Sequence, residues 1–164
     1  MPSISSVGNP PLGFEPEYRT CRGIPRGASA TKGQLWKFDL EQSDGDVSNA
    51  AIGDTNSCFA NLVQPDAVGV ESGVFAVAAE DITEDRAGTW ILSGVCQALV
   101  QKGSGNIAIG NPLMATASQN YLDADVTAGG IHLAKALEAV TGPSTATLAK
   151  VWFDGTIGFG VHVS

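Results

Sequence analysis

Two histidines and seventeen acidic residues are the side chains of this chain best suited to acid–base or metal chemistry. His132 and His162 both lie in apolar, alternating segments. A histidine there could act as a general base, although a structural histidine is the commoner case. Two histidines form a tetrahedral metal site only if acidic ligands complete it. By themselves, they indicate neither a catalytic centre nor a metal centre.

One acidic segment resembles the opening of a calcium-binding loop. Asp44, Asp46 and Ser48 have the right spacing. However, Asn49 stands where such a loop needs glycine, and Thr55 stands where it needs the bidentate glutamate. We therefore interpret this segment as a solvated acidic loop, and we expect no metal ligands in it.

A second acidic cluster, Asp81, Glu84 and Asp85, precedes Gly88 and is typical of a turn. A carboxylate pair for glycoside hydrolysis remains open among so many acids, but only eleven aromatic residues exist to line a cleft. No nucleophile elbow and no phosphate-binding loop is present. We expect no enzymatic activity and no cofactor. A hydrolase using a carboxylate pair or a histidine is the enzymatic alternative.

The cysteines Cys21, Cys58 and Cys96 are odd in number and widely spaced. This pattern is neither a disulfide framework nor a metal cluster, and it predicts free or buried thiols in a reducing compartment. The first residues lack the features of a secretory signal, and no apolar run approaches the length of a membrane span. We expect a protein made in the cytoplasm, with no membrane partner.

Charge is distributed unevenly along the chain. The net charge is −8, but residues 1–37 carry +3 and residues 38–125 carry −11. The overall charge argues against nucleic-acid binding through a general basic surface. A basic segment on an acidic body suggests docking to something acidic, such as another copy of the protein.

Residues 1–33 differ from the rest because they hold five of the eight prolines and show no periodicity. Proline removes backbone donors and glycine weakens strands, so we expect an extended, irregular arm here. A flexible terminus and an arm ordered by a partner are both open. The candidate contacts of this arm with a partner or with a neighbouring copy are Phe14, Tyr18, Arg19, Arg22 and Arg26.

The remaining residues, 34–164, predict one β-rich domain. Only 16% of the residues are charged and 20 are glycine, which favours an all-β chain rich in turns. Residues 131–140 fit both a helix and a strand. The fold class expected is a compact β-barrel or sandwich of short strands, and no period of 20–50 residues indicates a solenoid or propeller. Strands are expected near residues 34–40, 58–63, 74–79, 90–100, 107–109, 113–115 and 151–163.

Four stretches in the second half of the chain together carry a resemblance. They are residues 73–82 (GVFAVAAEDI), 88–95 (GTWILSGV), 109–113 (IGNPL) and 134–140 (AKALEAV), the last leading to KVWF at residues 150–153. In this order they resemble the capsid decoration, or cement, proteins of tailed bacteriophages. The resemblance covers about half of the chain and rests on strand and turn patterns.

This sequence departs from the family pattern at Asn111, where an acidic residue is usual, and in its longer arm and acidic loop. The resemblance implies a noncatalytic β protein, commonly a trimer, that binds a preformed phage shell. It also implies a strand within residues 131–140. The expected function is decoration and stabilisation of the outer capsid surface by bridging adjacent major capsid protein subunits. The alternative is another virion module, such as a head-fibre, tail or host-adhesion domain.

Overall fold

The computed structural model describes residues 19–38, 60–65, 74–116, 119–125 and 132–156. These residues form nine β-strands and no helix, so the predicted all-β class is confirmed. In particular, the described residues include no helix that could span a membrane. The strands are β1 (Arg19–Pro25), β2 (Leu35–Phe38), β3 (Ala60–Val63), β4 (Phe75–Ala78), β5 (Gly88–Gln101), β6 (Pro112–Ala115), β7 (Leu122–Asp123), β8 (His132–Ala136) and β9 (Thr147–Asp154).

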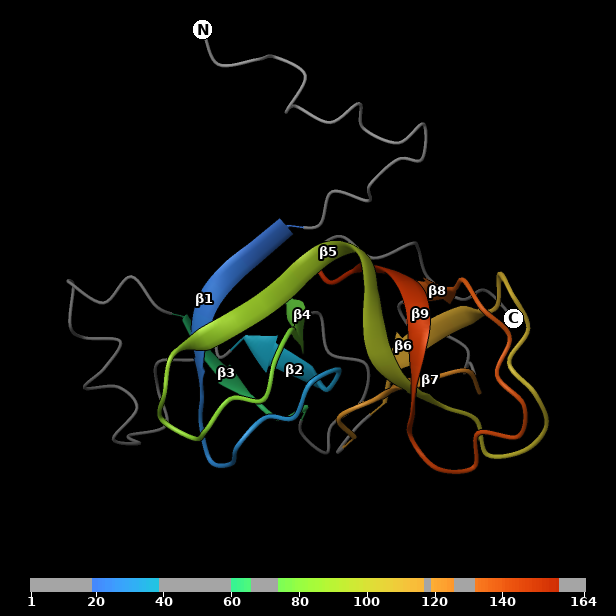
Figure 1. Cartoon of the computed structure of the whole chain (residues 1–164), viewed down its shortest axis with the longest axis horizontal. Coiled ribbons are helices and arrows are strands. Elements are labelled where there is room, and N and C mark those ends of the chain that lie inside the picture. The colour runs from blue at the N-terminus through green and yellow to red at the C-terminus, as the bar shows by residue number, and fades with distance from the viewer. Residues whose placement is uncertain (1–18, 39–59, 66–73, 117–118, 126–131, 157–164) are drawn as a thin grey trace, which may run out of the picture.

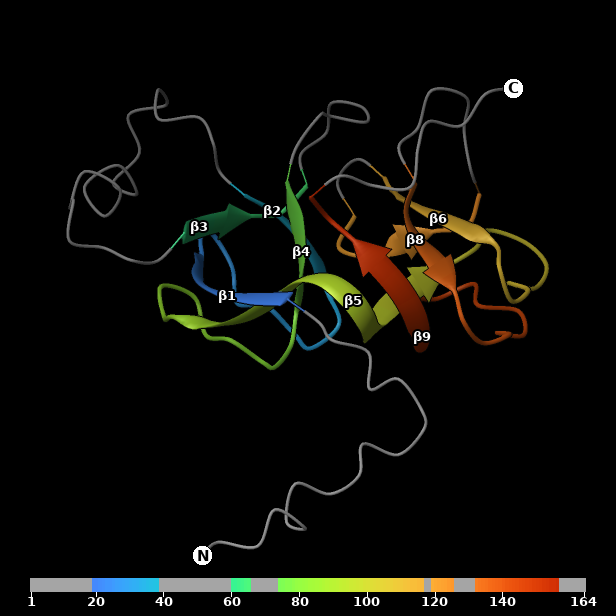
Figure 2. The ribbon, with the colours of Figure 1, turned by 90° about the horizontal axis from the view of Figure 1, so that it is seen from above.

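The long strand β5 belongs to two closed rings of strands. Its first half pairs with β1 and β4, and its second half pairs with β9 and β7. The ring orders are β1-β3-β2-β4-β5 and β5-β7-β6-β8-β9. Figures 1 and 2 show the result: β1 to β4 form one lobe, β6 to β9 form the other, and β5 runs through both. We call these the first and second lobes.

The two lobes have the same topology. Each strand of the first ring corresponds to the strand four places later in the second ring. The directions also agree, because β1–β3 and β5–β7 are parallel and every other pair in both rings is antiparallel. The chain is therefore an internal structural repeat in which β5 is the last strand of one lobe and the first strand of the next.

Hydrogen bonds outside the strands repeat as well. Gly33 N–H donates to Ala78 O at 2.8 Å, and Gly110 N–H donates to Ala136 O at 2.8 Å. Three more pairs of hydrogen bonds match between the lobes, and two of these pairs have side-chain acceptors. The further matched pairs, first lobe then second, are Ala30 N–H to Ile82 O and Ile107 N–H to Val140 O; Thr31 N–H to Gln34 Oε1 and Ala108 N–H to Asn111 Oδ1; and Thr89 N–H to Glu80 Oε1 and Lys150 N–H to Glu138 Oε1.

Each lobe buries its own interior. In the first lobe, the rings of Trp36 and Trp90 meet edge to face with centroids 5.7 Å apart, a favourable aromatic geometry. Trp90 Nε1 donates to Gly23 O at 3.0 Å, so its polar atom is satisfied. In the second lobe the corresponding positions are Leu113 and Val151, both fully buried.

The part of the first lobe's outward face that lies over β2, β4 and the middle of β5 is also buried. Side chains alternate between the two faces of a strand, and the residues that point away from the Trp36 core are Leu35, Val77 and Ile91. These three join the core cluster of the second lobe. Hydrogen bonds from Leu99 N–H to Gly33 O and from Phe75 N–H to Gly155 O, both 2.8 Å, fix the contact. The lobes therefore form one continuous body.

Some strand predictions are corrected by the structure. The expected strand at residues 107–109 is wrong: only Ile107 forms an isolated bridge, because the chain turns at Gly110 with φ +85°. The ambiguous residues 131–140 contain strand β8, as the resemblance implied. The predicted strand at 90–100 is confirmed as the longer β5, which bends at Gly94 with φ +116°.

Within the predicted arm of residues 1–33, the segment 19–25 forms strand β1 and pairs with both β3 and β5. Residues 1–18 lie outside the described residues, as does the acidic loop with its calcium-like spacing. Strand β7 was not expected from the sequence. It has only two residues and is set by its pairing with β6 and β5.

Candidate docking surfaces

Some of the residues predicted to be contacts of the arm lie in or next to β1, and the others lie outside the described residues. Arg19 is exposed at the start of β1. Arg22 is also exposed, but its guanidinium donates to Thr89 Oγ1 and Ala87 O, both at 3.1 Å, and lies 4.0 Å from Glu80. Phe14 and Tyr18 lie outside the described residues. Of the predicted arginines, Arg19 is therefore the one best placed to meet a partner.

Arg26 has a structural role in the first lobe. Its Nε donates to Asn61 Oδ1 at 2.9 Å and its Nη1 lies 2.6 Å from Asp85 Oδ1. Asp85 holds a positive φ of 60°, which is unusual for a residue other than glycine. The ion pair thus ties the end of β1 to the turn after β4.

The acidic cluster forms the turn that its sequence predicted. Asp81 accepts a hydrogen bond from Lys32 N–H at 2.8 Å, and Ser29 Oγ accepts one from Glu84 N–H at 3.0 Å. These contacts, together with the Asp85 ion pair, join the loop before β2 to the loop after β4. Within the described ranges, no group of three or more His, Cys, Asp or Glu residues could hold a metal ion.

The structure describes one of the two histidines. His132 is the first residue of β8, where it pairs in register with Met114 of β6. His162 lies outside the described residues.

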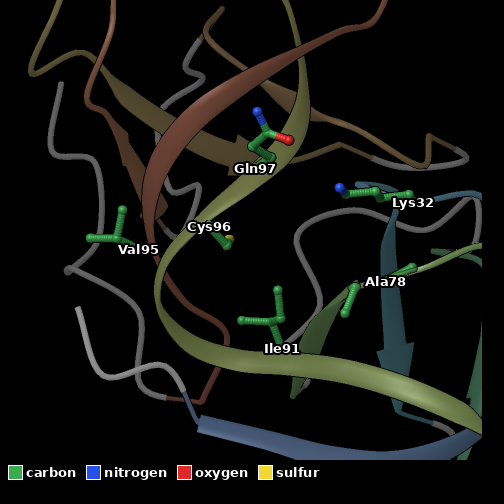
Figure 3. Close-up of a pocket in the computed structure, with 7 residues that line it drawn as sticks. Lys32, Ala78, Ile91, Val95, Cys96 and Gln97 are labelled. Carbon is green, nitrogen blue, oxygen red and sulfur yellow. The ribbon is translucent and has the colours of Figure 1, made fainter. Parts of the chain in front are cut away.

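A hollow of about 210 Å³ lies at the junction between the lobes. Figure 3 shows Lys32 reaching towards β5 above Ile91 and Ala78, with Cys96 and Gln97 on the bent strand. Its lining is mainly apolar, with one ammonium and one amide. Its volume lies below the roughly 300–1,000 Å³ that is usual for small-molecule sites. The hollow marks where the second lobe covers the first.

Two of the three cysteines occupy corresponding positions. Cys21 of β1 and Cys96 of β5 both point towards the interior of their lobes and are free thiols. Burial raises the pKa of Cys96 to about 12 and also raises the pKa of Cys21. A thiol that stays protonated is a poor nucleophile, so neither position resembles a catalytic cysteine. Cys58 lies outside the described residues.

Large apolar side chains are exposed on the second lobe, and sequence reasoning missed them. Trp152 is 52% exposed and Ile109 is 69% exposed, while Leu148 is 42% exposed. Trp152 lies on β9 and Ile109 lies in the turn before β6. The alternation of β9 carried the signal, because Val151 and Phe153 face the core and therefore place Trp152 outside.

No family model matches the sequence, and no curated protein matches it significantly. Among solved structures, the fold is similar to the head fiber gp8.5 N base of bacteriophage phi29. The TM-score is 0.50, the sequence identity is 11%, and the match covers 84% of this chain and 95% of the other. At this identity, the likeness shows a shared fold that includes both lobes of the structure.

Proposed function

We propose that this chain is a structural, noncatalytic protein of a bacteriophage particle, bound to the outer surface of the head. In this proposal it decorates the shell and bridges adjacent major capsid protein subunits. Its partners are the major capsid protein and further copies of itself, as a homotrimer. It needs no cofactor and binds neither nucleic acid nor a membrane.

The observation that carries the proposal is the similarity of fold to the head fiber base of phage phi29 over 95% of that structure. A fold by itself does not determine a function. Here the fold agrees with a second, independent observation, the resemblance of four sequence stretches to phage cement proteins. Both point to a protein of the phage particle.

The surfaces described above support a docking role. The acidic cluster of the first lobe forms turn contacts and an ion pair within that lobe, and the hollow at the lobe junction is small and mainly apolar. The second lobe also exposes large apolar side chains, as in protein–protein contacts, where aromatic residues are enriched.

A head-fibre base is the second candidate, and the same neighbour favours it. The two candidates differ in what they do to the shell. A bridging decoration protein makes the shell more resistant to disruption, because each copy holds two subunits together. A fibre base needs only an attachment point, and its binding leaves the stability of the shell unchanged.

The test is co-sedimentation of the purified protein with intact and expanded heads of the phage that encodes it. Since β1 begins at Arg19, the arm is removed by deleting residues 2–18, which leaves the described strands complete. We expect the full chain to co-sediment stoichiometrically and the deletion to lose binding. Heat disruption of the loaded heads then separates bridging from simple attachment.

Arg19→Ala and Arg86→Ala form a matched pair for this test. Both arginines are exposed, but Arg19 adjoins the arm and Arg86 lies in the turn after β4. We expect only Arg19→Ala to weaken binding to heads. If neither the full chain nor the deletion binds heads, the proposed function is wrong.

A further inference from the structure

The outward faces of the two lobes correspond residue by residue but differ in exposure. In the first lobe, Val77 and Ile91 are covered by the second lobe, and Ile91 is 8% exposed. In the second lobe, the register of β8 with β9 places Lys135 and Trp152 at these positions. Trp152 is 52% exposed. The second lobe thus presents a face of the kind that the first lobe buries.

The turn before β2 and the corresponding turn before β6 also differ in exposure. Lys32 lies above Ile91 and lines the hollow at the lobe junction (Figure 3). Matched hydrogen bonds at Gly33 and Gly110 place Ile109 at the position of Lys32. Ile109 is 69% exposed. The turn of the second lobe therefore carries an exposed apolar residue at the position where the first lobe has a lysine.

The ends of the two lobes that correspond to the receiving side of this contact also differ in burial. The end of the second lobe that receives the first includes Cys96 and Phe153, both buried. The corresponding residues of the first lobe are Cys21 and Leu92, and both are only partly buried. The chain therefore has one partly exposed face on the second lobe and one partly buried end on the first, and these two surfaces correspond to a contact that it already makes internally.

We infer that the face of Trp152 and Ile109 packs against the Cys21–Leu92 end of the first lobe in a second copy of this chain. Within one chain, the first lobe packs on the second. In the proposed contact, the second lobe of one copy packs in the same way on the first lobe of the next copy. This contact is heterologous, because each copy uses different surfaces for its two neighbours, and such contacts close into a ring or extend into a filament. The inference deepens the self-association in the proposed function and rests on it.

One internal hydrogen bond cannot be repeated between copies. Leu35 N–H donates to Asn120 O at 2.9 Å, but the corresponding residue of the second lobe is Pro112, which has no N–H. The contact between copies should therefore depend on side chains, above all on Trp152. Aromatic residues at the centre of an interface commonly carry a large part of the binding energy.

The first test measures self-association of the full chain by sedimentation velocity over a range of concentrations, without phage heads. We expect an oligomer whose dissociation constant rises about 30-fold or more for Trp152→Ser, the effect typical of a central aromatic residue. Ile109→Asp should act in the same direction, and it lies in an exposed turn. The control Ser104→Asp, in the exposed turn after β5, should associate like the original chain.

The second test uses the heterologous geometry. Thr20→Arg places a cation on β1 next to Cys21, at the position that corresponds to Val95, which lines the hollow at the lobe junction. We expect Thr20→Arg and Trp152→Ser each to be monomeric alone. Mixed together, they should form a one-to-one dimer that grows no further, because each variant keeps one intact surface.

Shell binding is measured separately, so the two proposals can fail independently. A full chain that binds heads but stays monomeric at all concentrations overturns the contact between copies and leaves the proposed function intact. An oligomer that Trp152→Ser and Ile109→Asp leave unchanged also overturns it. So does a change in Trp152 fluorescence when residues 2–18 are deleted from a monomer, since the chain's own N-terminus would then cover this face.

Discussion

The first and second lobes share a topology but fill it with different side chains. The first lobe has the Trp36–Trp90 pair at its centre, whereas the second has Leu113 and Val151 at the same places. The first lobe also buries the outward side chains Leu35, Val77 and Ile91, and the second leaves Trp152 outside. The backbone hydrogen bonds at the turns are common to both. The repeat is thus defined by its backbone connections, and the surfaces are what differ between the lobes.

The largest expected effect comes from the core of the first lobe. Trp90→Ala should lower the free energy of unfolding by about 3–5 kcal/mol, the usual cost of removing a fully buried tryptophan. Leu113→Ala, in the second lobe, should cost about 2–5 kcal/mol. The measurement is urea denaturation followed by circular dichroism.

Both core variants should unfold in one transition. The outward residues of the first lobe lie in the core of the second, so neither lobe can lose its packing alone. Two separate transitions in either variant would show that the lobes are independent units, contrary to this view of the fold.

The repeat was invisible in the sequence for a physical reason. Corresponding strands are 75 residues apart for Cys21 and Cys96, but 58 apart for Glu80 and Glu138, because the connecting loops differ in length. A search for a fixed period fails under such changes. The all-β class and β5 were predictable, since composition and alternation depend on local sequence.

The exposed face of the second lobe was harder to predict than the strands. The alternation of β9 shows that Trp152 and Phe153 point to opposite faces of the sheet. It does not show which of these faces packs against another lobe. That depends on the closing of two rings around β5, which arises from pairings between distant residues. The roles of Arg22 and Arg26 were hidden for the same reason, because their partners lie on other strands.

A matched pair of glycines compares the two turns directly. Gly33 and Gly110 have φ values of +86° and +85°, so alanine at either site should cost about 1–2 kcal/mol in backbone strain. A Cβ on Gly33 would also meet Leu148 and the backbone nitrogen of Leu99, whereas one on Gly110 meets nothing within 4 Å. Gly33→Ala should therefore lose a further ~1–3 kcal/mol.

Urea denaturation of both glycine variants at concentrations where the chain is monomeric checks this difference. Equal losses would indicate that the loop of Gly33 is not held against the second lobe. The same pair bears on self-association, because an alanine at Gly110 lies beside Ile109.

A smaller effect separates the two corresponding cysteines. The pKa of Cys96 is raised to about 12 from 9.0, so the unfolded chain loses this proton first as the pH rises. Below about pH 9 this thiol is protonated in both the folded and the unfolded chain, so it adds no pH dependence to the free energy of unfolding. Between pH 9 and about 12, the free energy of unfolding should fall by at most about 1.4 kcal/mol per pH unit. Cys96→Ala should remove this part of the alkaline slope.

Alkylation by iodoacetamide, followed by peptide mass spectrometry, provides a direct comparison of the two thiols. Cys21 is partly exposed and should be modified at least tenfold faster than Cys96 in the folded chain. Similar rates would mean that the end of the first lobe is as well covered as that of the second.

The smallest effect concerns Glu80, which lies on the surface of the first lobe. The hydrogen bond from Thr89 N–H, and to a lesser extent the charge of Arg22, lowers the pKa of this carboxyl below 4.5. As the pH falls, the unfolded chain binds the proton first. The contribution of Glu80 is therefore complete above about pH 4.5 and is lost as the pH falls through the lower folded value.

Glu80→Gln should make the urea midpoint less sensitive to pH between 5 and 3, because its amide oxygen can still accept from Thr89 N–H without titrating. Part of the difference should disappear at high salt, which screens the exposed Arg22 charge. Glu138→Gln is the matched variant, since Glu138 accepts from Lys150 N–H and Gln97 replaces Arg22 there. A salt-sensitive difference in the second lobe as large as in the first would contradict the role given to Arg22.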